Sequence, residues 1–585
     1  MKWLMKNKKG DLKGIMSSQG INEVIGRLLI NRGYETVPKV EEFFRDSYND
    51  LHSFKLLKGS LEGAEIIKQN IEENAKIRII GDYDVDGIIS TYVLYQGLKK
   101  CGADVDFDIP HRIEDGYGIS IALIEKAFEE GINTIVTCDN GIAALEEISH
   151  AKELGLTVIV SDHHDIPYVN DGDEKEYLQS EADVIINPKQ SQCNYPFDKI
   201  CGAGVAFKFL QAVYDICGID IVESYMFIEY IAIATVCDVV DLVDENRTIV
   251  KIGLEKLSET TNIGLKALIN KSGINNAKLS SYHLGFVIGP CLNASGRLDT
   301  AIRGLKLLLE TNEDQAEIMA EELVEMNNSR KDMTKDGVVK AIEKIENSSI
   351  KNDRVLVVLI EETHESLAGI IAGRIREKYY KPTIILTEAK EGLKGSGRSV
   401  EAYDMFVELT KCKDLLGRFG GHPMAAGMSL ELDKLDQFRK QINSVCTLSE
   451  EELEPKLSLD ALLPIHKISE ELIHEISLLE PYGKANPKPV FGEKNVLITE
   501  AKIIGKNKNV LKLRLKDKSG MLIDGIFFGD IDKFREAITN RYGISASENV
   551  FERVSDDYYV DIAFYPDINS YNGRNSLQAI ISAFK

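Results

Sequence analysis

The chain has 585 residues, too many for a single hydrophobic core, so we expect three or four domains. Apolar residues make up 44% and charged residues 28%, which is typical of globular proteins, and the longest apolar runs are too short to span a bilayer. The net charge of −23 weighs against a partner held by bulk positive charge, but it does not exclude a nucleic acid bound in a local groove.

The first residues, MKWLMKNKKG, are basic, and no apolar stretch follows them, so we expect no signal peptide. The nine cysteines are scattered and form no CxxC pair. This pattern indicates reduced thiols, as opposed to a disulfide framework or a zinc site. We therefore expect a cytoplasmic protein.

The first 75 residues carry apolar side chains at helical spacing, as in INEVIGRLLINRGYE, and predict a helical segment. From residue 76, short β-rich runs alternate with helical stretches of about a dozen residues. The predicted strands are AKIRIIGD, DVDFDIP, NTIVTCD, TVIVSD and ADVIINP. This alternation predicts βαβ units and a parallel sheet covered by helices on both faces.

Helices dominate from about residue 200 to 345 and include a long charged stretch, which can connect two lobes or be a plain surface helix. A second α/β pattern begins at DRVLVVLIEE and includes two glycine-rich stretches, GLKGSGRSV and GRFGGHPMAAGMSL, which we interpret as turns or loops. After an acidic linker, short strands with polar turns predict a small β-barrel or sandwich. We place the domains at residues 1–75, 76–300, 301–349, 350–450 and 451–585.

Acidic residues and histidines gather where predicted strands end. The set comprises Asp82, Asp84 and Asp86; Asp139; Asp162, His163 and His164; and Asp238 after the apolar run IAIATVC. Ligands of an open parallel sheet bind at the carboxyl ends of its strands, so we expect these clusters to converge. Carboxylates with imidazoles and no thiolate suit Mn²⁺ or Mg²⁺, and paired ions of this kind promote displacement at phosphorus.

Each residue alone has a simpler interpretation. A loop aspartate after a strand is usually a turn or N-cap residue, which applies to Asp86 before GIIS and to Asp139 in CDNG. We place all four clusters at strand ends, and four such clusters are hard to explain as independent turns. The joint metal site is therefore the better interpretation.

The ordered motifs DYDVDG, CDNG, SDHH and TVCDVV resemble those of the DHH phosphoesterase superfamily. Within it, the chain is similar to the RecJ family of single-strand-specific exonucleases. The similarity continues in order through PHRIEDGYGIS, CGAGVAFKFL, GPCLNASGRL, GSGRS and GRFGGHPMAAGMSL, and it covers nearly the whole chain. It implies an α/β DHH catalytic domain with a parallel sheet, connecting helices, an α/β DHH-associated domain and a C-terminal OB-fold-like β domain.

The resemblance also implies roles for individual residues. Two ions, Mn²⁺ or Mg²⁺, would be held by Asp82, Asp84, Asp86, Asp139, His163 and Asp238, with Asp139 between them. These six residues and His164 would form the catalytic set, and Asp162 would orient His163. The implied substrate-binding residues are His164, Asn293, Arg297, Arg374, Ser396, Arg398, Gly420, Gly421 and His422. Cys291 stands where the family usually has an arginine.

The C-terminal β region matches the position of the family's OB fold, which binds single strands. Basic residues there are Lys506, Lys508, Lys512 and Arg514, although a solvated strand face explains them equally well. Of Phe527 and Phe528, we expect one in the core and one outside it.

The resemblance implies a metal-dependent single-strand-specific 5′→3′ DNA exonuclease of DNA repair and recombination, which releases 5′-mononucleotides. Its substrate would be single-stranded DNA, with a helicase and a single-strand-binding protein as candidate partners. An alternative is a phosphodiesterase of short oligonucleotides or cyclic dinucleotides from the same superfamily. A non-catalytic DNA-binding scaffold is disfavoured, because every ligand position of the motif set is filled.

Overall fold

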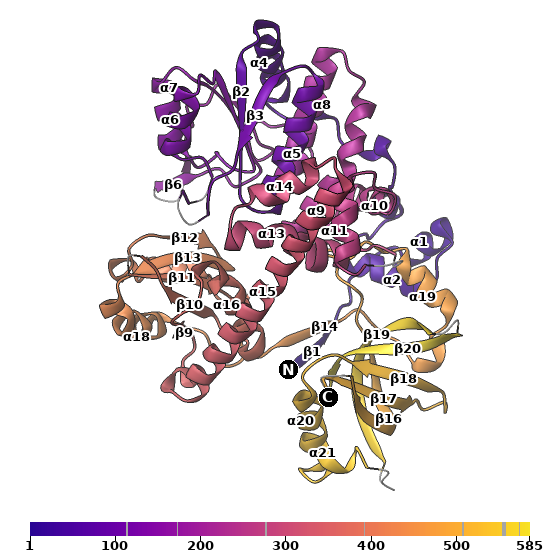
Figure 1. Cartoon of the computed structure of the whole chain (residues 1–585). Coiled ribbons are helices and arrows are strands. Elements are labelled where there is room, and N and C mark those ends of the chain that lie inside the picture. The colour runs from indigo at the N-terminus through magenta and orange to yellow at the C-terminus, as the bar shows by residue number, and fades with distance from the viewer. Residues whose placement is uncertain are drawn as a thin grey trace. The chain divides into compact units, whose positions relative to one another are not determined.

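The computed structural model describes residues 1–112, 115–116, 118–171, 174–274, 278–390, 392–505, 508–552, 557–571 and 574–585. The chain divides into two compact units (Figure 1). Unit 1 consists of Met1–Asp50, Asp241–Lys251 and Lys456–Lys585, and unit 2 of Leu51–Val240 and Ile252–Pro455. Among the described residues, no helix combines the length and the apolar character needed to cross a membrane.

Unit 2 contains the predicted parallel sheet. Its strands are β2 (Lys76–Gly81), β3 (Asp104–Asp108), β4 (Thr134–Cys138), β5 (Thr157–Ser161) and β8 (Val184–Ile186). They lie in the order β3-β2-β4-β5-β8, and each neighbouring pair is parallel, which confirms the prediction. The chain passes from β2 to β3 on one side and then to β4 on the other. The carboxyl ends of β2 and β4 therefore form a topological switch point, where such sheets bind ligands.

Helices cover both faces of this sheet, as predicted. Figure 1 shows α6 (Ile121–Glu129) and α7 (Leu145–Glu153) on one side, with α5 (Val85–Lys100) and α8 (Gly202–Cys217) on the other. The helix α4 (Ser60–Glu73) packs against α8. Strand β4 is buried along its whole length, because both faces of the sheet are covered.

A group of helices follows the sheet in the chain. It comprises α9 (Ile228–Cys237), α11 (Ile263–Lys271), α12 (Ser281–His283), α13 (Gly289–Leu298), α14 (Ile302–Leu309) and α15 (Glu313–Glu346), with a π-helical turn at Leu284–Ile288. The long charged stretch is α15, a helix of 34 residues. It contacts α11 and α13 near its start and α16 (Ala368–Tyr379) further along, so it does connect the two parts of unit 2 (Figure 1).

A second sheet of unit 2 has the order β12-β13-β11-β10-β9. Its strands are β9 (Leu356–Leu359), β10 (Thr383–Glu388), β11 (Leu393–Arg398), β12 (Phe419–His422) and β13 (Ala425–Leu430). We interpreted the glycine-rich stretches as turns or loops, and this was wrong, because they form β11, β12 and β13. Glycine is a weak strand former, but here close packing favours it: a Cβ on Gly395 would lie 2.5 Å from the Leu386 side chain.

The predicted barrel is in unit 1. Its strands are β16 (Phe491–Ile504), β17 (Val510–Lys516), β18 (Leu522–Phe527), β20 (Arg574–Phe584) and β19 (Tyr558–Tyr571), and pairing of β16 with β19 closes it. As expected, Phe527 is buried and Phe528 is exposed. Lys512 and Arg514 both pair with Asp524, at 3.0 and 2.6 Å, whereas Lys506 lies outside the described residues.

Three N-terminal helices share the hydrophobic core of the barrel unit: α1 (Leu12–Gln19), α2 (Glu23–Asn31) and α3 (Val37–Phe43). The predicted helical segment 1–75 is thus divided, because α4 belongs to unit 2. We missed the short strand β1 (Lys2–Met5), which pairs in parallel with β14 (Lys456–Leu459). Its partner is more than 450 residues away, so the local sequence carries no signal for it.

Unit 1 depends on a buried cation. Arg247 is 2% exposed, its guanidinium lies 4.0 Å from the centre of the Phe43 ring, and its Nη2 donates to the carbonyl oxygens of Leu478 and Glu480. We expect Arg247→Ala to lower the free energy of unfolding by about 3 kcal/mol, because two hydrogen bonds from a charged donor and the contact with the Phe43 ring are lost. The control Lys251→Ala removes only a surface ion pair with Asp46, so it should cost less than about 1 kcal/mol. Urea denaturation of both variants measures the difference, and equal costs would contradict the account.

Candidate metal centre and substrate pocket

The first acidic motif lies between the end of β2 and the start of α5. Asp84 is the N-cap of α5, and its Oδ1 accepts hydrogen bonds from the backbone N–H groups of Asp86 and Gly87 at 2.8 and 3.2 Å. The capping role that we considered for Asp86 therefore belongs to Asp84. The buried Asp86 carboxylate instead accepts from the N–H groups of Gly202 and Ala203, at 2.6 and 2.8 Å. These are the first N–H groups of α8, and a helix N-terminus favours an anion.

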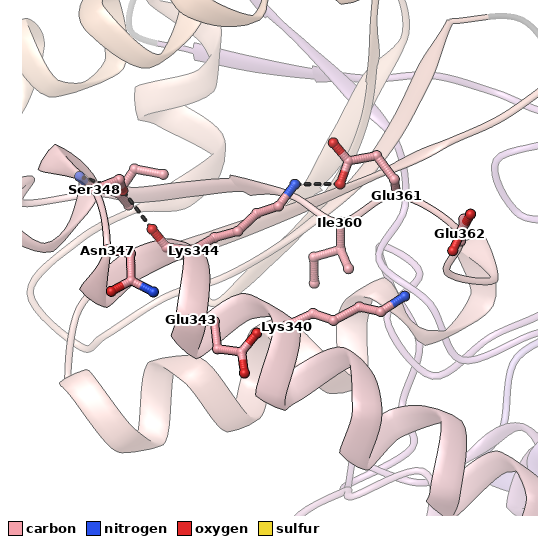
Figure 2. A pocket seen from close by; sticks show the side chains of 9 residues that line it. Lys340, Glu343, Lys344, Asn347, Ser348, Ile360, Glu361 and Glu362 are labelled. Atoms are coloured by element: carbon pink, nitrogen blue, oxygen red, sulfur yellow. Dashed lines mark hydrogen bonds and ion pairs between the residues drawn. The ribbon is translucent and has the colours of Figure 1, made fainter.

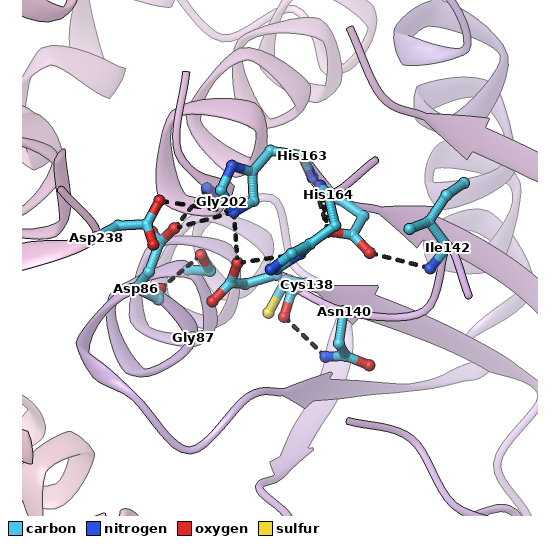
Figure 3. A network of polar contacts seen from close by, with 12 residues as sticks. Asp86, Gly87, Cys138, Asn140, Ile142, His163, His164, Gly202 and Asp238 are labelled. Carbon is cyan, nitrogen blue, oxygen red and sulfur yellow. Dashed lines mark hydrogen bonds and ion pairs between the residues drawn. The ribbon is translucent and has the colours of Figure 1, made fainter. Parts of the chain in front are cut away.

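His163 brings the other clusters together. Its Nδ1 lies 3.0 Å from the carbonyl oxygen of Ile200, which can only accept, so Nδ1 donates. Its Nε2 then faces three carboxylates, at 3.2 Å from Asp139, 3.7 Å from Asp238 and 3.8 Å from Asp86. Figure 3 shows His163, Asp86 and Asp238 directed toward one another.

We counted Asp238 among residues at strand ends, and this was wrong. It is the C-cap of helix α9, which packs on α5. A short apolar run is compatible with a buried strand or with a buried helix, and periodicity alone does not distinguish them. The helix nevertheless ends at the same place as the strands, so Asp238 joins the cluster.

The donor atoms form three overlapping groups, within each of which they lie less than 4.8 Å apart. The groups are Asp82, Asp84 and Asp139; Asp86, His163 and Asp238; and Asp139, His163 and His164. Asp139 and His163 thus link two sets of oxygen and nitrogen donors. Such an arrangement suits a pair of divalent ions.

The electrostatics of the cluster also fit cations. Burial, and then the charge of Asp84, raises the pKa of Asp82 to about 8 and that of Asp86 to about 7. Burial and the neighbouring carboxylates raise the pKa of Asp139 well above its usual range. Burial and the nearby His164 lower the pKa of His163 to about 3, so its Nε2 presents a lone pair to carboxylate oxygens. Asp82 Oδ1 is buried and has no hydrogen-bond partner among the described residues. A positive ion between these groups removes the repulsion.

His164 differs from its neighbour. Asp162 Oδ1 accepts from His164 Nδ1 at 2.7 Å, and the Asp162 carboxylate also accepts from the N–H groups of His163 and Ile142. Our expectation that Asp162 orients the His163 ring was therefore wrong, since a backbone carbonyl does so. Burial alone lowers the pKa of His164, but the hydrogen bond and charge of Asp162 outweigh it and raise the pKa to about 9. The His164 side chain is 40% exposed, so it can reach a substrate.

A pocket of about 690 Å³ adjoins the carboxylate cluster, because its wall includes Tyr83, which lies between Asp82 and Asp84. Among the residues that line it are Arg112, Arg297, Arg374, Lys394, Ser396 and Arg398. Four of these were predicted to bind substrate: Arg297, Arg374, Ser396 and Arg398. We did not assign a role to Arg112, although it belongs to the quoted stretch PHRIEDGYGIS; its guanidinium stacks on Tyr83 at 4.3 Å.

The other predicted substrate residues lie outside the wall of this pocket. Asn293 is on α13, and its Oδ1 is buried with no hydrogen-bond partner among the residues described. Gly420, Gly421 and His422 form the exposed edge strand β12. Asp165 follows the two histidines in sequence, and its pKa is lowered first by the hydrogen bond from Lys189 and, to a smaller extent, by neighbours that include His422. The edge strand β12 therefore lies near the turn after β5 that carries His163 and His164.

A second hollow, of about 550 Å³, lies at the C-terminal end of α15 (Figure 2). Its lysines are matched by acids: Lys344 pairs with Glu361, and Lys340 lies among Glu343, Glu361 and Glu362 along the same wall. None of the predicted site residues lines it. We therefore assign it no part in the candidate site.

Family models match three parts of the chain: the DHH family N-terminal domain at residues 76–235, the DHHA1 domain at 352–448 and the RecJ OB domain at 459–583. The chain is 35% identical to the single-stranded-DNA-specific exonuclease RecJ of Bacillus subtilis, over 89% of this chain and 65% of the relative's length. It is 33% identical to the protein of the same name from Salmonella typhimurium, over 95% of both chains.

Solved structures of a Thermus thermophilus protein agree in fold. The crystal structure of its RecJ in complex with Mn²⁺ is 24% identical and superposes with a TM-score of 0.80, covering all of this chain and 79% of that one. A complex of the same protein with Mg²⁺ gives 0.75. The predicted combination of DHH, DHH-associated and OB-fold domains is thereby confirmed.

The raised pKa values predict how the metal-free protein responds to pH. Asp82 and Asp86 bind protons more tightly when folded than when unfolded, so their contribution to stability is complete below about pH 4 and is lost as the pH rises through about 7 to 8. The melting temperature in EDTA should therefore fall over that range. A hundredfold excess of Mn²⁺ over its dissociation constant should restore about 2.7 kcal/mol at alkaline pH.

Differential scanning calorimetry of the EDTA-treated and Mn²⁺-treated protein checks this expectation. Asp86→Asn should weaken both the pH dependence and the stabilisation by Mn²⁺, whereas Asp104→Asn, at the exposed start of β3, should change neither. A melting temperature that does not respond to Mn²⁺ at any pH would refute the metal centre.

Proposed function

The chain belongs to the RecJ family, and on this basis we propose that it is a single-strand-specific 5′→3′ DNA exonuclease that releases 5′-mononucleotides. The observation that carries the proposal is the carboxylate and histidine cluster at the switch point, directly beside a pocket rich in arginine. The relatives named as single-stranded-DNA-specific exonucleases support the choice of substrate. These relatives match 89% and 95% of this chain, so a short-oligonucleotide phosphodiesterase is the weaker alternative.

The proposed cofactors are two divalent ions, Mn²⁺ or Mg²⁺. Asp82, Asp84 and Asp139 would hold one ion, and Asp86, His163 and Asp238 the other. When bound, the ions would lower the pKa of an attacking water and stabilise negative charge that develops around phosphorus. The short separation of His163 Nε2 and Asp139 Oδ1, 3.2 Å, supports Asp139 as the residue between the two sites.

The protein's own groups would position and orient the reacting strand. Backbone N–H groups at the start of α8 fix both oxygens of Asp86, and the carbonyl of Ile200 fixes the His163 ring, so the centre is preorganised. Asp162 holds His164 Nδ1–H, which leaves Nε2 to donate to a phosphate oxygen or to the leaving 3′ oxygen. With a pKa of about 9, His164 carries that proton at neutral pH.

The arginine pocket would bind the phosphate at the 5′ end. Its volume suits a ligand of nucleotide size. Arg398 Nη1 donates to Ser396 Oγ at 2.9 Å, and Arg297 Nη1 donates to the Ser366 carbonyl at 2.9 Å, so both guanidinium groups are held in place with donors to spare. A terminal phosphate in this pocket places the first linkage near the carboxylates, which gives 5′→3′ polarity.

The remaining parts of the proposal concern the cell. The barrel of unit 1 would bind a further part of the strand, in DNA repair and recombination. A single-strand-specific enzyme needs duplex DNA to be opened, and we propose no strand-separating activity for either unit. A helicase and a single-strand-binding protein are therefore candidate partners. All nine cysteines are free thiols, which fits the reducing cytoplasm that we propose as the compartment.

Asp139→Ala should lower nuclease activity by at least about a thousandfold, because a shared ligand of both ions contributes several kcal/mol of charge stabilisation. Degradation of single-stranded DNA labelled at the 5′ or the 3′ end, with Mn²⁺ or EDTA, measures the loss. Duplex DNA and RNA serve as substrate controls, and the exposed Asp104→Ala as the protein control. Full activity of Asp139→Ala, or release of the 3′ label first, would sink the proposal.

Arg398→Ala should raise KM for a 5′-phosphorylated strand about 10- to 100-fold, and much less for a strand with a 5′ hydroxyl, because only the former loses a charge-assisted hydrogen bond. The control is Lys378→Ala, a charge removed from the exposed side of α16. Steady-state kinetics on the two strands distinguish the outcomes. An equal rise for both strands would place Arg398 elsewhere along the DNA.

A further inference from the structure

Two aromatic rings stack on the surface of unit 2. Tyr282 and Phe286 are 61% and 64% exposed, their ring centres are 5.2 Å apart, and their planes differ by 22°. Each ring therefore covers part of one face of the other, and the His283 ring contacts Tyr282 in a T-shaped arrangement with 5.8 Å between ring centres. A single exposed aromatic residue needs no explanation, but an exposed, nearly parallel pair matches a surface on which planar ligands can stack.

The backbone beneath the pair is rigid. Tyr282 belongs to α12, and Phe286 to the π-helical turn Leu284–Ile288, which runs directly into α13. Leu284 and Ile288 are fully buried, so the inner side of the same turns is anchored in the core. A π-helical turn inside a helix is uncommon and often marks a functional site. The backbone that carries the two rings therefore does not need to be ordered by a ligand.

The segment that carries the pair packs beside the candidate metal centre. Cys237 Sγ contacts the carbonyl oxygen of Leu284 at 3.5 Å, and a Cβ on Gly289 would lie 2.2 Å from that sulfur. The aromatic segment thus packs on the last turn of α9, which ends at Asp238.

The other end of the same helical segment carries Arg297, which lines the arginine pocket. Eleven residues separate Phe286 from Arg297, about 16 Å along a helix. The segment therefore runs from the pocket, past the carboxylate cluster, to the stacked pair. A strand that follows it meets the three features in that order.

We propose that Tyr282 and Phe286 form a stacking platform for bases on the 3′ side of the linkage that is cut. This inference rests on the proposed function. Single-strand-binding proteins hold bases on aromatic rings, whatever the base, because every base has a flat π face. The platform explains how a chain with a net charge of −23 retains a strand beyond the basic pocket. It also predicts a preference for long strands, since a dinucleotide ends before the platform.

The test compares the double variant Tyr282→Ala/Phe286→Ala with the unaltered full-length protein in Mn²⁺. We expect KM for a long oligothymidine to rise about 10- to 100-fold, with kcat unchanged, because stacking partners are lost and the reacting groups are not. KM for a thymidine dinucleotide should not change. The exchange Tyr282→Phe/Phe286→Tyr keeps both rings and should keep the original KM.

Phe128→Ala removes another exposed aromatic side chain of unit 2, on α6, and should leave both KM values unchanged. Melting temperatures of all variants report whether the fold is intact. If the unaltered protein cleaves long strands and the double alanine variant has the same KM for them, the two rings do not bind bases. The same KM is also expected if the rings bind a partner protein instead of DNA. If the unaltered protein cleaves no single strand, the proposed function fails as well.

Discussion

The repulsion among buried carboxylates is the constraint on which unit 2 depends. Asp82, Asp86 and Asp139 are each at most 2% exposed and share one small space. The fold supplies only part of the compensation, through the N–H groups that begin α8 and cap Asp86. Even the glycine at that helix start is required, because a Cβ on Gly202 would lie 2.6 Å from Asp139. We propose that positive ions complete the balance, so that the same ions stabilise the fold and supply the chemistry.

The sequence predicted the site well wherever one topological rule applied. Residues after β2, β4 and β5 had to meet, because parallel strands end at the same edge. The rule does not apply to Asp238, which ends a helix. It also does not predict that Asp162 pairs with His164, because this depends on how the histidine ring is oriented. It also could not find Arg112, whose position is set by a loop, or the glycine-rich strands, whose pairing overrides local propensity. The roles of the individual ligands and the domain boundaries stay predictions.

The distribution of charge reconciles an acidic chain with the polyanionic substrate that we propose. In the barrel, Lys512 and Arg514 both pair with Asp524, so their charge is partly compensated. In the pocket, the described wall sets five basic side chains against two acidic ones, Glu365 and Glu377. Cys291, where the family usually has an arginine, is buried and contacts Asn327 at 3.3 Å, which in turn accepts from Arg330. Cys291 therefore contributes an interior contact between α13 and α15. It does not line the pocket, whose basic side chains come from other residues.

We propose that the carboxylate and histidine cluster holds two neighbouring divalent ions. Electron paramagnetic resonance of the metal-stripped protein titrated with Mn²⁺ tests it most directly, because two ions roughly 4 Å apart are magnetically coupled. We expect two bound Mn²⁺ per chain with a coupled spectrum, and one uncoupled ion or none after Asp139→Ala. A single, uncoupled Mn²⁺ in the unaltered protein at saturation would contradict it.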